Sequence, residues 1–204
     1  MGLILLIVGV AAVITGVFFI ANNSGKGELS NTLSNTNQGE NHMDKTGKTI
    51  VVYYSAQNHT KNVATKIAEN LSADIFEIVP EQVYTDEDLD WTNQDSRVSR
   101  EHDNVSLRNI AIKSTDVPNW DAYDTVLLGY PIWWGIAAWP TDTFVKGVDF
   151  GDKTVIPFCT SQSSGVGESA TLLKDEAKGG NWQSGYRFSQ NATDSEIKTW
   201  TDNL

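Results

Sequence analysis

The sequence predicts an α/β fold built on a parallel sheet. From residue 49 onward, short apolar runs alternate with helical patterns, which is typical of strands joined by crossover helices. The apolar runs are nearly continuous, as expected for strands that are buried on both faces of a sheet. Polar loops follow three of these runs, at the positions where an open α/β sheet binds its ligands. These observations predict one ligand-binding domain in residues 48–204.

Five strands and four main helices are expected in this domain. The first helix is well marked because Val63, Ile67 and Leu71 recur at the spacing that places them on one helical face. Residues 80–118 form a long connection between strands, so the middle of this segment is expected to be helical. The expected strands are residues 49–54, 74–79, 124–130 and 154–159, with a weaker fifth at 186–189, and the expected helices are residues 60–71, 141–146, 167–178 and 194–203.

The first 21 residues predict a membrane segment. Residues 2–21 are apolar and uncharged, and about 20 such residues cross a bilayer as a helix. A retained anchor is favoured over a cleaved signal because residues 19–21 match a cleavage site poorly, and Asn22 stands where a lipoprotein would carry its lipidated cysteine. Residues 22–47 are polar and predict a flexible tether. By analogy with bacterial export arrangements, we expect the domain on the outer side of the cell membrane.

Composition excludes several functions. The chain has 15 Lys+Arg and 26 Asp+Glu, for a net charge of −11, which argues against nonspecific binding to nucleic acid. Cys159 is the single cysteine, so no intramolecular disulfide and no multi-cysteine metal site can form. The three histidines are scattered, and no metal site is expected.

Three loops at the ends of predicted strands suggest a common ligand. Residues 55–60 lie between a strand and a helix, where free backbone N–H groups bind anions such as phosphate; an ordinary helix-capping turn is the alternative. Trp133 and Trp134 offer planar faces for stacking, unless they belong to the core. Residues 160–167 are rich in Ser and Gly, so their backbone can approach a ligand closely. A flat heteroaromatic phosphate ester would use all three loops.

The stretch Gly129-Tyr130-Pro131-Ile132-Trp133-Trp134-Gly135, together with the other two loops, resembles a bacterial branch of the flavodoxin family across about residues 48–204. The resemblance implies a three-layer α/β sandwich with a five-stranded parallel sheet in the order 2-1-3-4-5, and non-covalent FMN at its carboxyl edge. It implies no catalytic side chain. It implies that Ser55, Gln57, Asn58, His59 and Thr60 surround the FMN phosphate, that Pro131, Ile132, Trp133, Trp134 and Gly135 line the isoalloxazine, and that Ser161, Ser164 and Gly165 approach its pyrimidine side.

One residue departs from the family pattern. Flavodoxins commonly have a glycine in the first loop, where this chain has Asn58. Asparagine tolerates a left-handed backbone better than most residues do, so the loop can keep its shape. The neighbouring His59 either donates to the phosphate or faces solvent.

The favoured function is electron transfer by bound FMN between a redox partner protein and an acceptor. An FMN-dependent NAD(P)H oxidoreductase that reduces a quinone or a similar small electron acceptor is the alternative, and a non-redox binding module is a second one. The net negative charge would lower the reduction potential of the flavin.

Three further features have two interpretations each. The acidic run from Asp86 to Asp95 is either a solvated face or a docking site for a basic redox partner. Tyr84 and Trp91 are expected to be packing anchors rather than flavin contacts. Cys159 ends a predicted strand, where a small buried thiol is ordinary and a redox role is not expected.

Overall fold

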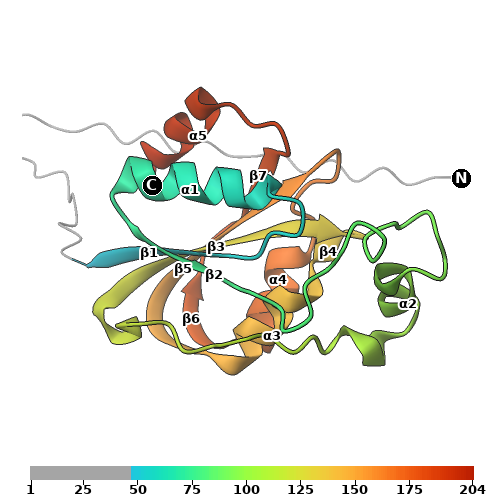
Figure 1. Cartoon of the computed structure of the whole chain (residues 1–204). Helices are drawn as coiled ribbons and strands as arrows, with labels where there is room; N and C mark the ends of the chain where they lie inside the picture. The colour runs from blue at the N-terminus through green and yellow to red at the C-terminus, as the bar shows by residue number, and fades with distance from the viewer. Residues whose placement is uncertain (1–46) are drawn as a thin grey trace, which may run out of the picture. The chain divides into compact units, whose positions relative to one another are not determined.

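The computed structural model describes residues 47–204 (Figure 1). The predicted membrane segment, residues 1–21, and nearly all of the predicted tether lie outside the described residues. Among residues 47–204, no helix has the length and apolar character needed to cross a membrane.

The sheet has seven strands, and its main path runs in the order β2-β1-β3-β5-β6 with all neighbours parallel. β7 also pairs in parallel with β5, beyond the residues that pair with β6. The predicted order 2-1-3-4-5 is therefore confirmed, with β6 and β7 sharing the fifth position. The strands are β1 (Lys48–Tyr53), β2 (Asp74–Glu77), β3 (Tyr123–Trp133), β4 (Ile136–Ala137), β5 (Asp149–Ser161), β6 (Lys178–Trp182) and β7 (Tyr186–Ser189).

Helices cover both faces of the sheet, as expected for a three-layer sandwich. In Figure 1, α1 and α5 lie on one face, and α3 and α4 lie on the other. The helices are α1 (His59–Leu71), α2 (Arg97–Asp103), α3 (Trp139–Gly147), α4 (Ser169–Glu176) and α5 (Asp194–Thr201), with short 3₁₀ turns η1 (Val105–Arg108) and η2 (Trp120–Ala122).

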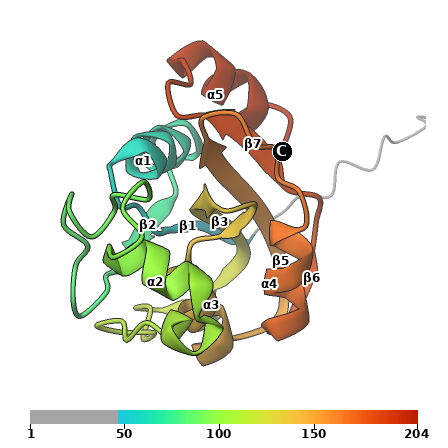
Figure 2. The same cartoon turned by 90° about the vertical axis from the view of Figure 1, so that its right-hand side faces the viewer.

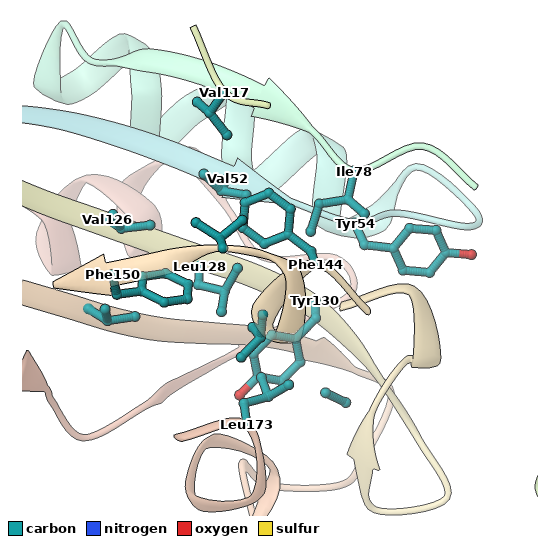
Figure 3. Packing of buried hydrophobic residues seen from close by; sticks show 14 of the residues in the cluster. Val52, Tyr54, Ile78, Val117, Val126, Leu128, Tyr130, Phe144, Phe150 and Leu173 are labelled. Atoms are coloured by element: carbon teal, nitrogen blue, oxygen red, sulfur yellow. The ribbon is translucent and has the colours of Figure 1, made fainter. Parts of the chain in front are cut away.

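Each face of the sheet has its own hydrophobic cluster, because successive strand residues point to opposite faces. Along β1 and the residue after it, Val51 and Tyr53 join the cluster under α1 and α5, whereas Val52 and Tyr54 join the cluster with α3 and α4. Figure 3 shows the second cluster, with Phe144 among its members. Both clusters lie within residues 47–204, so this part of the chain contains the core that an independently folding domain needs.

Two strands were not predicted. The expected helix 167–178 ends at Glu176, and Lys178 begins β6 instead. β6 contains glycines rather than β-branched residues, because its backbone passes very close to β5: a Cβ on Gly179 would lie 2.7 Å from the carbonyl oxygen of Gly151. β4 is only two residues long and forms a hairpin with the end of β3. Neither strand has the apolar run by which strands are found in a sequence.

The long connection between β2 and β3 contains α2 and η1, as expected for the middle of residues 80–118. Figure 2 views the end of the molecule at which α2 lies, with this helix in front of the sheet. The connection therefore extends to the edge at which the predicted ligand loops lie.

Candidate functional site

A cavity of about 440 Å³ opens at the carboxyl ends of β1, β3 and β5. It lies where ligands bind in open α/β sheets. Its walls come from the three loops singled out in the sequence, from the connection before α2 and the first turn of that helix, and from the loop after β7. The lining residues are Ser55, Ala56, Gln57, His59, Thr60, Leu89, Trp91, Val98, Pro131, Ile132, Trp133, Trp134, Thr160, Ser161, Gln162 and Gln190.

The first loop is shaped by Asn58, which precedes α1 in the left-handed conformation, with φ 65° and ψ −6°. This is the position at which the resemblance expects glycine, and the conformation explains that preference. The Asn58 side chain makes no helix-capping hydrogen bond, although its carbonyl accepts from the N–H of Asn62 at 2.9 Å. Asn58 therefore contributes its backbone conformation to the site.

The backbone of the first loop is rich in free donors. Within residues 47–204, no backbone carbonyl accepts a hydrogen bond from the N–H groups of residues 55–61. The first turn of a helix leaves such groups unpaired and carries a partial positive charge. The loop thus presents donors at the cavity, in the arrangement that binds an anion.

Side chains of the first loop fasten it to neighbouring strands. Thr60 Oγ1 lies 2.8 Å from Thr160 Oγ1, and both residues are buried. His59 Nδ1 donates to the carbonyl of Gln190 at 3.2 Å, and Nε2 has no hydrogen-bond partner among residues 47–204. His59 is half-buried in the cavity wall rather than free in solvent. The nearby Lys61 forms an ion pair with Glu77 at 3.2 Å, and it does not line the cavity.

The two tryptophans have different surroundings. Trp133 meets Tyr54, Tyr84 and Trp139 edge to face, with ring centroids 5.9, 5.2 and 5.4 Å apart. These contacts fix Trp133 between the core and the cavity, so it packs against the core and also lines the cavity.

Trp134 lies at the tip of the β3–β4 hairpin and is 43% exposed. It has φ 46°, and Gly135 has φ 84°, as a tight two-residue hairpin requires. A bulky residue is rare in this conformation. The Trp134 ring stacks on His102 at 4.4 Å. The hairpin thus holds a large planar side chain at the cavity in a conformation that tryptophan seldom adopts, a type of strain that clusters at functional sites.

The connection before α2 supplies part of the wall that the sequence did not indicate. Trp91 is 70% exposed and lines the cavity, so its prediction as a packing anchor is wrong. Tyr84 is buried as expected; its hydroxyl donates to Glu101 at 2.6 Å, and burial raises the pKa of this phenol far above its ordinary value. Arg97 lies over the Tyr84 ring and pairs with Glu101 at 2.8 Å. This buried cluster anchors the connection.

The structure brings most of the predicted site residues into one wall. Four of them do not line the cavity: Asn58 and Gly135 shape their loops, while Ser164 and Gly165 lie farther along the third loop. The predicted residues that line it are Ser55, Gln57, His59, Thr60, Pro131, Ile132, Trp133, Trp134 and Ser161. Three more lining residues, Ala56, Thr160 and Gln162, belong to the predicted loops but were not among the predicted site residues. The lining residues outside the predicted loops are Leu89, Trp91, Val98 and Gln190.

The wall contains no Asp, Glu, Lys or Arg side chain. Among residues 47–204, no group of His, Cys, Asp and Glu side chains is arranged to hold a metal ion. Cys159 is buried away from the wall, and burial raises the pKa of its thiol to about 12, so the unreactive protonated form predominates. The groups of the wall suit the binding of a planar anion.

Comparisons with known proteins agree with this geometry. A family model described as flavodoxin matches residues 48–204. A protein provisionally named a flavoprotein from Bacteroides uniformis ATCC 8492 is 37% identical, with a TM-score of 0.70, over 76% of this chain and 98% of its own. One with the same description from Bacteroides eggerthii DSM 20697 is 39% identical, with a TM-score of 0.68, over 77% and 97%.

A flavoprotein from Lactobacillus acidophilus NCFM, solved in complex with FMN, is 24% identical, with a TM-score of 0.58, over 76% of this chain and 99% of its own. At this identity the likeness is one of fold. No curated protein matches the chain.

Proposed function

Because the chain belongs to the flavodoxin family, we propose that it binds FMN and transfers electrons as a membrane-tethered carrier. The observation that carries this proposal is that a donor-rich loop, an aromatic hairpin and a Ser/Gly-containing loop converge on the same cavity. Each matches one part of FMN: the phosphate, the isoalloxazine ring and the polar edge of that ring.

The residues have separate tasks in this proposal. The N–H groups of residues 55–61 bind the phosphate, and the start of α1 adds a favourable electrostatic potential. Trp134, on the hairpin, and Trp91, on the connection before α2, provide exposed aromatic surface for the ring. Bound FMN supplies the redox chemistry, while the protein supplies binding, orientation and electrostatics.

A carrier is favoured over an NAD(P)H oxidoreductase by the surface next to the cavity. Asp86, Glu87, Asp88 and Asp90 lie on the connection that also contributes Leu89 and Trp91 to the cavity wall. Acidic side chains beside an electron-transfer site attract a basic partner and speed its association. The partner is accordingly a protein with a basic docking face.

Reduction kinetics distinguish the carrier from the enzyme. With FMN bound to residues 44–204, we expect NADH or NADPH alone to bleach the flavin absorbance slowly, and a flavodoxin reductase with NADPH to bleach it fast. The fast reaction should slow at high salt, because screening weakens charge steering. Rapid bleaching by a nicotinamide nucleotide alone would instead identify an oxidoreductase.

The tether and its location rest on the sequence of the first 47 residues. The uncharged run of residues 2–21 anchors the domain in the cell membrane, and residues 22–47 hold it on the outer side. In bacteria expressing the full chain, we expect it in the membrane fraction after carbonate washing, and protease added to intact cells should release the domain. A soluble chain, or one protected from protease until lysis, would contradict the anchor or the outer location, respectively.

A further inference from the structure

Arg187 lies in β7, immediately behind the wall of the cavity. Its Nε donates to Ser161 Oγ at 3.0 Å, and its Nη2 donates to the carbonyls of Ser161 and Gln162 at 2.9 and 3.0 Å. Ser161 Oγ in turn donates to the carbonyl of Ser164. One guanidinium group therefore organises the start of the third loop, since its planar fork fixes several acceptors at once.

These bonds orient two peptide groups, and the N–H of Gln190 also donates to the carbonyl of Ser161 at 3.2 Å. A trans peptide holds its C=O and N–H in opposite directions. Because the carbonyls of Ser161 and Gln162 accept from Arg187, the next N–H groups, those of Gln162 and Ser163, point away from it. Neither N–H has a protein acceptor within residues 47–204. Gln162 lines the cavity, so these donors are available to a ligand on the cavity side of the loop.

The charge of Arg187 is also uncompensated nearby. Among residues 47–204, no carboxylate lies within 4.0 Å of its guanidinium group. In the described part of the chain, Arg187 is the charged side chain that donates hydrogen bonds to the cavity wall, which itself contains no Asp, Glu, Lys or Arg. A half-buried cation is screened less than a surface one and therefore acts over a longer range.

We propose that Arg187 is a positioning residue that aims the N–H groups of Gln162 and Ser163 at the polar edge of the flavin, and that its charge favours reduced over oxidised FMN. This inference rests on the proposed function. It identifies a local feature that opposes the lowering of the potential by the net charge of −11. No proton or electron passes through Arg187, which acts only on the relative affinity for the two forms.

The test uses residues 44–204 with three substitutions. Arg187→Gln removes both charge and fork, Arg187→Lys keeps the charge but not the fork, and Lys178→Gln removes one positive charge from β6, which pairs with the opposite end of β5. For each protein, the FMN affinity, the two-electron midpoint potential by equilibration with dyes, and NMR order parameters of the FMN-free backbone are measured.

For Arg187→Gln we expect the preference for reduced FMN to fall about tenfold, which lowers the midpoint potential by roughly 30 mV. Arg187→Lys should retain most of the potential, while in both Arg187 variants the order parameters of Gln162 and Ser163 fall from rigid values of about 0.85 towards 0.6. Lys178→Gln should change neither quantity.

Equal potentials in Arg187→Gln and Lys178→Gln would overturn the electrostatic role. Unchanged order parameters in FMN-free Arg187→Gln would overturn the positioning role, and this readout needs no FMN. If the unsubstituted protein fails to bind FMN, the proposed function fails instead, so the two failures are distinguishable.

Discussion

Replacing Asn58 with alanine tests whether the left-handed conformation of the first loop is required. The residue has φ 65° and ψ −6°. Alanine in this region costs roughly 1–2 kcal/mol, whereas asparagine adopts it more readily. The variant must therefore either hold the conformation, at a cost in stability, or leave it, at a cost in phosphate binding.

The cost in stability and the cost in binding both come from the free energy that alanine needs to adopt the left-handed conformation. The loss in the unfolding free energy of the ligand-free protein and the loss in FMN binding free energy should together reach about 1–2 kcal/mol. If stability carries the loss, the melting temperature falls by about 2–4 °C per kcal/mol. If binding carries it, the Kd rises about tenfold per 1.4 kcal/mol. Asn58→Gly is the matched control, because glycine adopts this conformation without strain, and its FMN affinity should not fall.

Urea unfolding of the ligand-free protein and a fluorescence titration with FMN measure the two quantities. The reasoning predicts that their sum distinguishes Asn58→Ala from Asn58→Gly. If alanine leaves both the unfolding free energy and the Kd unchanged, the backbone at Asn58 does not have to be left-handed, and the structural reason for the family's glycine is wrong.

Three further substitutions probe the remaining parts of the site, and a fourth probes a buried carboxyl group in α3. Trp134→Ala should weaken FMN binding about tenfold through lost stacking and leave urea stability nearly unchanged, because this ring is 43% exposed. Trp133→Ala should cost about 3–5 kcal/mol in unfolding free energy, because its ring packs on three aromatic neighbours; a loss of binding alone would contradict this division. Thr60→Val should cost about 1–3 kcal/mol because it leaves Thr160 without its buried partner, and a double Val variant should recover part of that loss in the same unfolding assay. Burial, followed by the nearby acidic charge, raises the pKa of Asp142 from 3.8 to about 7, so its contribution to stability is present below pH 4 and is lost as pH rises through 7. Asp142→Asn should thus stabilise the protein by roughly 4 kcal/mol at pH 8 and little at pH 4, since each unit of pKa shift corresponds to about 1.4 kcal/mol, and an equal effect at both pH values would refute the shift.

The sheet was predictable because its central strands are short, nearly continuous apolar runs, and these runs do not show the spacing of a helix. β1 and β3 pack on both faces, so every residue from Ile50 to Tyr53 is buried. The fifth position was predicted only in part. There, β6 contains glycines that lie against the backbone of β5. Glycine has no apolar side chain, so the sequence of β6 lacks the apolar run that would identify a strand.

The site was predictable where local sequence determines it. The first loop and the Trp-Trp-Gly hairpin follow strands directly, so their residues reach the carboxyl edge by topology alone. Trp91 and Gln190 line the same cavity but belong to segments far from the three loops in the sequence, and it is the folding of the chain that brings them there. A sequence gives no measure of that path. Arg187 was missed for a similar reason: its partners, Ser161 and Gln162, lie on a neighbouring strand end.

The central claim is that the cavity binds FMN through its phosphate as well as its ring. A fluorescence titration of residues 44–204 with FMN, and separately with riboflavin, tests this directly. The account predicts tight quenching by FMN and binding of riboflavin that is weaker by at least about tenfold, since one charge-assisted hydrogen bond contributes roughly 1.5–3 kcal/mol. Equal affinity for the two ligands would contradict the role of residues 55–61, and no binding of either by the folded domain would contradict the proposed function.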